Sequence, residues 1–354
     1  MISIPDPRRP NMDAGRWARL RHLFVECLSD SSEISQRLVL VEPNNAPESV
    51  NQWEALEFPP NLLPWVTRYR QVGNRSLYLW RWCLYAVDRM TLSSVGEAWL
   101  PATRDMKFLV GMFNCLIDDV VDHDHNPRLF RALLSLFHGG TPTGESEAEQ
   151  KLAEFVTEVW IEIWRRAGEL PRFAEFKTLL EFDLRQVATT VEHSGLMSQL
   201  PEMVNQIEHD LYSAHGMTVT VAATIDLMAS PDFDRKDLAG LRSLLWHAES
   251  MARIGNLVST WEREIPDGDF TSGVFMEAVW RGLLTPEQLR SDNQEELKAT
   301  IIQSDIEADF LRKWEHHRKQ VRSLGSKIKS VDIENYVGRL DQLLESELFS
   351  HGRK

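Results

Sequence analysis

Apolar residues recur every three or four positions along most of the chain after about residue 50, and this spacing places them on one face of an α-helix. In the segment 75–90, RSLYLWRWCLYAVDRM, the apolar stripe includes Leu77, Trp80 and Leu84. The same spacing continues through the segments 104–119, 148–170, 171–195, 201–216, 233–264, 285–330 and 332–349. These segments predict a chain that is helical almost throughout.

Signals for β-structure are scarce by comparison. The segment 36–43, QRLVLVEP, is the best strand candidate, and it has no neighbour to pair with. No stretch rich in Pro, Gly or Ser is long enough to separate two domains, and no repeat or glycine-rich nucleotide loop is present. We therefore predict a less regular N-terminal segment, 1–50, followed by one all-α domain of roughly ten helices over 51–354.

The composition argues against several classes of function. Of the 354 residues, 43% are apolar and 26% are charged, which is the balance of a globular chain rather than a disordered one. No run of about 18 apolar residues occurs, so we expect no membrane span. The formal net charge of −14 argues against a nucleic-acid partner, because contact with phosphates requires clustered Lys and Arg.

The cysteines and the N-terminus bear on the compartment. Cys27, Cys83 and Cys115 lie far apart without CxxC spacing, which argues against a disulfide framework and against a zinc site. The N-terminal residues lack the apolar core of a signal peptide. We therefore expect a cytoplasmic protein.

An acidic cluster follows an apolar run in the segment 113–130, FNCLIDDVVDHDHNPRLF. On a helix, Asp118, Asp119 and Asp122 share one face at the C-terminal end of that run. They repel one another there, and the partial negative charge of a helix C-terminus adds to the repulsion. The cluster is either a solvated helix end or a site for Mg²⁺, which binds carboxylate oxygens, water and phosphates.

A second row of oxygen-bearing side chains stands far downstream, in the segment 252–273. Asn256, Thr260 and Glu264 are spaced four residues apart, so an amide oxygen, a hydroxyl and a carboxylate line one helical face in consecutive turns. Such a row suits a hard cation, and Arg263 beside it suits phosphate oxygens. Taken alone, the row is equally well read as an ordinary polar face.

Together the two segments resemble the metal-binding motifs of class I terpene synthases. The segment 118–122 matches their aspartate-rich DDxxD motif, and Asn256, Thr260 and Glu264 match their NSE triad, with Arg263 at the basic position before the last acid. The resemblance covers about residues 60–345 and is closest to bacterial single-domain members, in particular to diterpene synthases of the kaurene-synthase-like group.

This resemblance implies a single helical bundle around a central cavity and a carbon–oxygen lyase activity. Three Mg²⁺ ions, bound with the substrate by Asp118, Asp122, Asn256, Thr260 and Glu264, would help to ionise a prenyl diphosphate. Asp118, Asp119 and Asp122 would be the catalytic residues. The allylic carbocation would then cyclise to a terpene. The subgroup implies a C20 substrate, either geranylgeranyl or a bicyclic copalyl-type diphosphate, with C15 farnesyl diphosphate as the alternative.

The chain departs from the family in the residues that bind the diphosphate. Leu257 stands where the family usually has Asp, and the family's upstream diphosphate-sensing Arg falls at Asp210. Arg185 is the nearest upstream arginine candidate, and its equivalence is open.

The family's C-terminal Arg-Tyr pair is also absent as such, because Tyr336 and Arg339 stand in the reverse order. We therefore expect Arg253 and Arg263 to bind the diphosphate.

The cavity itself should be lined by apolar and aromatic side chains, because π faces stabilise a carbocation. Met112 and Phe113, a turn or more before the acidic cluster, are expected to face it, and the family's helix break corresponds to Gly216. For any single aromatic residue, core packing is the alternative. The further candidates are Trp80, Trp82, Trp246, Phe275 and Trp280 for the cavity, and His215 and His247 for accepting the final proton.

Other readings of the sequence differ in the motifs they require. A prenyl-chain elongating enzyme would have a second DDxxD motif, and a protonation-initiated cyclase would have DxDD; neither is present. A metal-dependent phosphohydrolase built on His123 and Asp124, and a non-catalytic helical scaffold, stay open as alternatives. The resemblance allows a homodimer, and the sequence does not determine the product skeleton.

Overall fold

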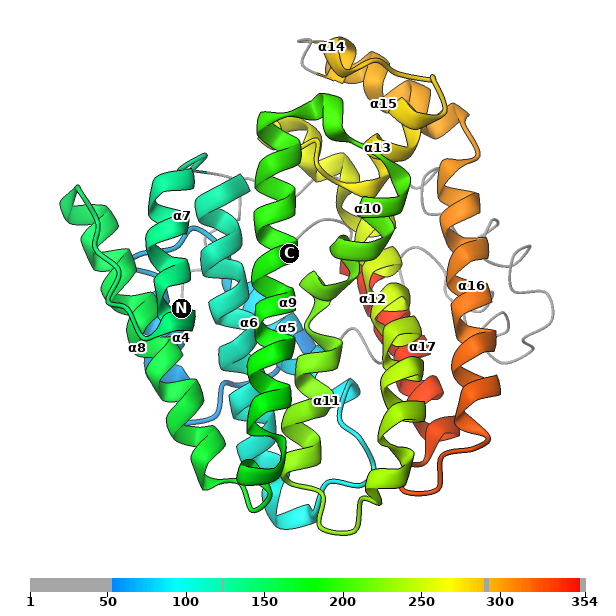
Figure 1. Cartoon of the computed structure of the whole chain (residues 1–354). Coiled ribbons are helices and arrows are strands. Elements are labelled where there is room, and N and C mark those ends of the chain that lie inside the picture. The colour runs from blue at the N-terminus through cyan, green and yellow to red at the C-terminus, as the bar shows by residue number, and fades with distance from the viewer. Residues whose placement is uncertain (1–52, 123, 290–292, 351–354) are drawn as a thin grey trace.

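The computed structural model describes residues 53–122, 124–289 and 293–350 (Figure 1). All regular structure in these ranges is helical, which confirms the all-α prediction. The segment 1–50 and the strand candidate 36–43 lie outside the described residues, so both stay predictions. None of the described helices is long and apolar enough to cross a membrane.

The helices follow the predicted segments closely in most of the chain. Thr285 caps its helix as expected, since its Oγ1 accepts a hydrogen bond from Gln288 N at 3.2 Å. The α-helices are α4 (Leu63–Tyr69), α5 (Leu77–Arg89), α6 (Leu100–Asp122), α7 (Pro127–Leu134), α8 (Glu147–Glu169), α9 (Phe173–Gln199), α10 (Gln206–Tyr212), α11 (Val219–Met228), α12 (Leu238–Asp267), α13 (Gly273–Trp280), α14 (Pro286–Leu289), α15 (Gln294–Gln303), α16 (Ile306–Gly325) and α17 (Ile333–Ser350).

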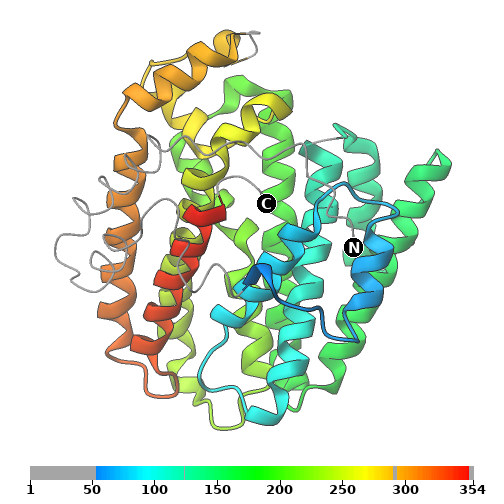
Figure 2. The ribbon, with the colours of Figure 1, turned by 180° about the vertical axis from the view of Figure 1, so that it is seen from behind.

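The long helices form a closed ring. Each of α5, α6, α9, α11, α12 and α17 packs against the next in that order, and α5 packs against both α6 and α17, which closes the circle. In Figure 1, α6, α9, α11 and α12 stand side by side across the front, and Figure 2 shows α5 and α17 on the opposite side. Outside the ring, α8 covers α6, and α16 covers α12 and α17. The ring leaves an interior space bounded on all sides by helices.

The segment 201–216, which the sequence predicts as one helix, is broken. A 3-10 turn precedes α10, the side chain of Asn205 caps α10 by accepting from Glu208 N, and a second 3-10 segment, η4 (Ser213–Met217), follows it. Thr218 then adopts a left-handed conformation with φ of 58°, which no helix interior permits. The chain therefore restarts as α11, a helix that the sequence patterns do not single out.

The C-terminal end of α12 is sharply defined. Gly268 ends the helix with φ of 71°, a conformation that glycine adopts without strain. Because this stop comes soon after Glu264, the chain turns back toward the ring through residues 269–272 before α13 begins. The turn places further polar side chains next to the end of α12.

Candidate active site

A cavity of about 220 Å³ lies inside the ring. Along α6, the residues that line it run from Phe108 to Asp122, a span of roughly 20 Å at the helical rise. Acidic side chains lie at the C-terminal end of that span. The apolar lining residues include Leu79 and Val87 of α5, Met90 directly after it, Phe108 of α6 and Leu343 of α17. The cavity therefore combines a charged end with an apolar interior.

The acidic cluster of α6 divides between two environments. Asp118 and Asp122 line the cavity, whereas Asp119 does not. Asp119 instead accepts hydrogen bonds from Arg75, from Nε at 2.9 Å and from Nη2 at 2.6 Å. The expectation that all three carboxylates share one face is thus wrong for Asp119, because one residue along a helix turns the side chain by about 100°.

The predicted row on α12 lines the same cavity. Asn256, Thr260 and Glu264 all contribute to its wall, and Thr260 Oγ1 lies 2.6 Å from Glu264 Oε1, to which it donates. Glu264 Oε2 is buried and has no hydrogen-bond partner among the described residues. Arg253 and Arg263 also line the cavity; Arg253 Nη1 donates to Asn256 Oδ1, and Arg263 lies near Glu264 and Asp267.

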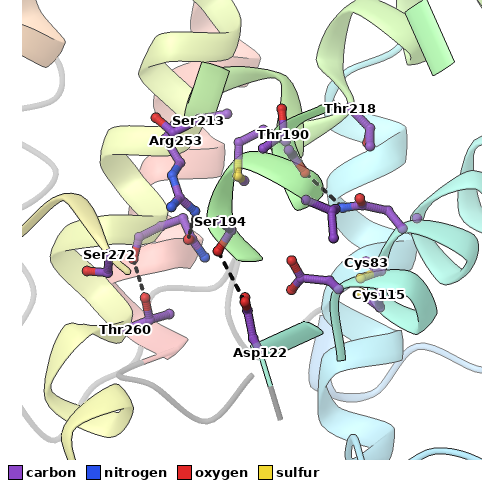
Figure 3. Close-up of a pocket in the computed structure, with 18 of the residues that line it drawn as sticks. Cys83, Cys115, Asp122, Thr190, Ser194, Ser213, Thr218, Arg253, Thr260 and Ser272 are labelled. Atoms are coloured by element: carbon purple, nitrogen blue, oxygen red, sulfur yellow. Dashed lines mark hydrogen bonds between the residues drawn. The ribbon is translucent and has the colours of Figure 1, made fainter. Parts of the chain in front are cut away.

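A chain of hydrogen bonds links the end of α6, through α9, to the residues that follow α12, and Figure 3 shows its first step, between Ser194 and Asp122. Ser194 of α9 lies 3.1 Å from Asp122 Oδ1 and 3.1 Å from Thr271 Oγ1, and Thr271 donates to Asp269 Oδ1 at 2.8 Å. Ser194, Asp269 and Thr271 all line the cavity, and sequence reasoning missed them. The sequence offers one signal for Asp269, its position directly after Gly268, the glycine that ends α12. The isolated hydroxyl residues Ser194 and Thr271 carry no such signal.

Burial disfavours the ionised form of the carboxyl groups at this end of the cavity. Burial, with the charge of Asp119, raises the pKa of Asp118 to about 6. Burial, with the charge of Asp269, raises the pKa of Glu264 to about 7, and burial with the charge of Asp118 raises the pKa of Asp122 well above its usual range. The positive charge of Arg253 opposes all three increases. Cations bound here would therefore relieve a real electrostatic strain.

The donor set fits a hard divalent cation. Carboxylate, amide and hydroxyl oxygens are what Mg²⁺ binds, and Glu264, which lines the cavity, has one carboxylate oxygen, Oε2, without a hydrogen-bond partner among the described residues. Within the described residues, no three His, Cys, Asp or Glu side chains lie close enough together to hold an ion by themselves. A cation held by these residues would thus take its remaining ligands from water or from a bound anion.

The cavity predictions on α6 need correction. Met112 and Phe113 are buried but do not line the cavity. Phe113 packs instead against Phe137 and against Trp160 of α8, with ring centroids 6.1 and 5.1 Å apart. Phe113 lies on the side of α6 that α8 covers, whereas the cavity side carries Phe108, Gly111, Asn114, Cys115, Asp118 and Asp122.

Gly216 lines the cavity from within η4, and its carbonyl oxygen accepts a hydrogen bond from Asn114 Nδ2 at 2.9 Å, whereas the left-handed residue before α11 is Thr218. Of the other aromatic candidates, Trp82 lines the cavity, Trp80 and Phe275 are fully buried in the core, and Trp246 and Trp280 are largely exposed.

Both histidines proposed as proton acceptors lie away from the cavity lining. His215 faces Glu249, and His247 faces His317. His193 and His209 line the cavity in their place. Burial lowers the pKa of both, so each is expected to be neutral near pH 7.

No family model matches this chain, and no curated protein shows detectable similarity to it.

Proposed function

We propose that this protein is a class I terpene synthase that ionises a prenyl diphosphate and cyclises the resulting allylic carbocation. The observation that carries the proposal is that two oxygen-bearing helical faces, far apart in sequence, line one cavity whose interior is apolar. The charged end of the cavity suits the diphosphate head of such a substrate, and the apolar interior suits its hydrocarbon tail. The helical ring around this cavity supports the bundle that the family resemblance implies.

The charged end has the residues that such a head group requires. Asp118 and Asp122 on one side and Asn256, Thr260 and Glu264 on the other would hold Mg²⁺. When bound, these ions would neutralise charge on the departing diphosphate. Arg253 and Arg263 would donate hydrogen bonds to its oxygens, and guanidinium groups are suited to this geometry. Stabilising the departing anion lowers the barrier to ionisation without any proton transfer.

The apolar interior would shield the carbocation from water and hold its chain in the conformation that cyclises. Phe108 and Trp82 offer π faces, each contributing about 0.5–2 kcal/mol of attraction to positive charge. The neutral histidine His193 could accept a proton when the cyclised cation is quenched. A C20 diphosphate is the proposed substrate, with farnesyl diphosphate as the alternative.

The test is to incubate the full chain with Mg²⁺ and geranyl, farnesyl, geranylgeranyl and copalyl diphosphates and to identify products by gas chromatography with mass spectrometry. Terpene hydrocarbons or alcohols support the proposal. Longer prenyl diphosphates would indicate chain elongation instead, and the absence of turnover on every substrate would favour a non-catalytic role.

Variants make the test specific to the site. Asp118→Ala and Asn256→Ala should each lower turnover by at least about 10²–10³-fold while leaving the helical circular dichroism unchanged. Glu262→Gln is the matched control, because Glu262 lies on α12 outside the cavity lining and pairs with Lys298 at 3.0 Å. Equal activity of Asp118→Ala and the control would contradict the assignment.

A further inference from the structure

The N-terminal end of α13 faces the cavity. Thr271 and Ser272, the residues directly before the helix, line the cavity, whereas the residues of α13 itself do not. The first N–H groups of any helix lack intrahelical partners and carry partial positive charge, which makes a helix N-terminus a binding place for phosphate groups. A helix N-terminus alone does not make a site, so the side chains around it decide the matter.

Ser272 occupies the N-cap position of α13 without capping it. A serine at this position usually accepts a hydrogen bond from an N–H of the first turn, but the Ser272 hydroxyl makes no such bond. The side chain is only 3% exposed, and its Oγ has no hydrogen-bond partner among the described residues. A buried hydroxyl left unpaired is costly, which indicates that it is held for a ligand.

His209 of α10 presents a second unpaired atom at the same place. Its side chain is 6% exposed, and Nε2 is buried without a hydrogen-bond partner in the described part of the chain. The imidazole edge lies against the first residue of α13, since a Cβ at Gly273 would stand 2.7 Å from its Cε1 and 3.2 Å from its Nε2. The absence of a side chain at Gly273 thus lets the imidazole reach the helix end.

A positively charged residue, Arg253, lines the same cavity as Ser272 and His209. The residues at the family's diphosphate-binding positions lie elsewhere. Burial lowers the pKa of His209; Asp210, whose Oδ1 lies 3.9 Å from Nδ1, opposes this decrease, and the charge of Arg253, which lines the same cavity, adds to it. Arg185, Tyr336 and Arg339, the nearest counterparts of the family's diphosphate-binding residues, do not line the cavity. Arg339 donates instead to backbone carbonyl oxygens of Asp88 and Thr91.

We propose that the N-terminus of α13, together with Ser272 and His209, is a binding site for the terminal phosphate of a diphosphate, next to Arg253. The proposal rests on the proposed function for the identity of the whole substrate, but it concerns the phosphate group alone. The Ser272 hydroxyl and the N–H groups of the first turn donate to phosphate oxygens, and a proton on His209 Nε2 adds a third kind of donor. The helix end would thereby add donors to those of Arg253 and Arg263, in place of the family's upstream arginine and C-terminal Arg-Tyr pair.

The experiment measures binding of inorganic pyrophosphate in the presence of Mg²⁺ to the full chain by isothermal titration calorimetry. Ser272→Ala and His209→Phe should each raise Kd roughly tenfold or more, as expected for the loss of a hydrogen bond to a charged group. Ser213→Ala is the matched control, since Ser213 is another buried hydroxyl that lines the cavity, from η4. It should bind pyrophosphate like the wild type.

Thermal unfolding without ligand separates binding from folding. Because the Ser272 hydroxyl makes no hydrogen bond in the ligand-free protein, Ser272→Ala should leave Tm unchanged. A lower Tm with an unchanged Kd would instead assign Ser272 a capping role and overturn the proposal.

Wild-type affinity in both Ser272→Ala and His209→Phe, or no binding of pyrophosphate by the wild type, would also overturn it. The proposed function fails on a different readout: wild-type protein that binds pyrophosphate but converts no prenyl diphosphate would refute the synthase while leaving the phosphate site in place.

Discussion

Arg253 donates a hydrogen bond from Nη1 to Oδ1 of Asn256 over 3.2 Å. The amide oxygen that is proposed to bind a cation therefore already accepts a hydrogen bond from a guanidinium. Among the described residues Arg253 forms no ion pair with a carboxylate, although its charge reaches Asp118, Asp122 and Glu264. The arrangement places a built-in positive charge between two acidic helices in the cation-free protein. A cation that binds Asn256 Oδ1 would compete with this positive charge, and we expect the guanidinium then to turn toward a bound anion.

Arg253→Ala should therefore change two measurements in opposite directions. Mg²⁺ alone should bind more tightly, because Asn256 Oδ1 becomes free and the acidic faces lose a competing charge. Turnover of a prenyl diphosphate should fall by about 10²–10³-fold, because a donor to the departing anion is lost. The first effect is measured as the Mg²⁺ concentration that half-saturates the increase in Tm, and the second as kcat/KM. Arg185→Ala, outside the cavity lining, is the control and should change neither.

The two adjacent aspartates of α6 should respond differently to substitution. Asp119→Asn breaks the ion pair with Arg75, whose side chain is only 18% exposed, and should destabilise the fold by about 1–3 kcal/mol. A chain of 354 residues then loses roughly 1–2 °C of Tm per kcal/mol. Residual turnover in Asp119→Asn should clearly exceed that of Asp118→Asn, because only Asp118 lines the cavity. Equal loss of turnover with no change in Tm would contradict this division of roles.

Glu264→Gln should raise stability at alkaline pH. Burial raises the pKa of Glu264 in the folded protein to about 7, above the ordinary value of 4.5, so the folded state holds this proton more tightly than the unfolded state. The stability linked to that proton is complete below about pH 4.5 and is lost as the pH rises through about 7. At pH 8 without divalent cations, the variant should melt a few degrees above the wild type, and at pH 4.5 the two should coincide.

Magnesium with pyrophosphate provides the counterpart of that measurement. The pair should raise the Tm of the wild type at pH 8 and should raise that of Glu264→Gln much less, because the carboxylate that binds the cation is gone. If Glu264→Gln were less stable than the wild type at pH 8 without divalent cations, the ionised carboxylate of Glu264 would not destabilise the folded protein, and the expectation would be wrong.

The helices could be predicted from local sequence patterns. The places where helices break could be predicted only in part. The apolar stripes and the Thr285 cap are local signals, and they gave α5, α6, α8, α9, α12 and α17. The interruption of the segment 201–216 depends on Thr218 in a left-handed conformation, which only tertiary packing imposes on a β-branched residue. The closure of the ring by α5 and α17 is likewise a long-range relationship without a local signal.

The residues at the site were predictable by type and spacing, but their orientation was not. The spacing on α12 placed Asn256, Thr260 and Glu264 on one face, and that face lines the cavity. On α6 the same reasoning could not decide which side faces inward, because this depends on α8, whose Trp160 packs against Phe113. Ser194 carries no sequence signal at all, since a single hydroxyl becomes functional only through its neighbours.

Gly111 offers a test of how far the apolar part of the cavity serves the substrate tail. It lines the cavity from the middle of α6, and a Cβ built there meets no atom within 4 Å. Gly111→Ala should therefore fold with an equal or higher Tm, since alanine stabilises a helix interior by about 1 kcal/mol over glycine. Gly111→Leu should fill the cavity and lower kcat/KM for a C20 diphosphate at least about tenfold more than for a C15 one. Products from both substrates, compared within each variant, measure this ratio; an unchanged ratio in a folded Gly111→Leu would show that the tail does not reach this part of α6.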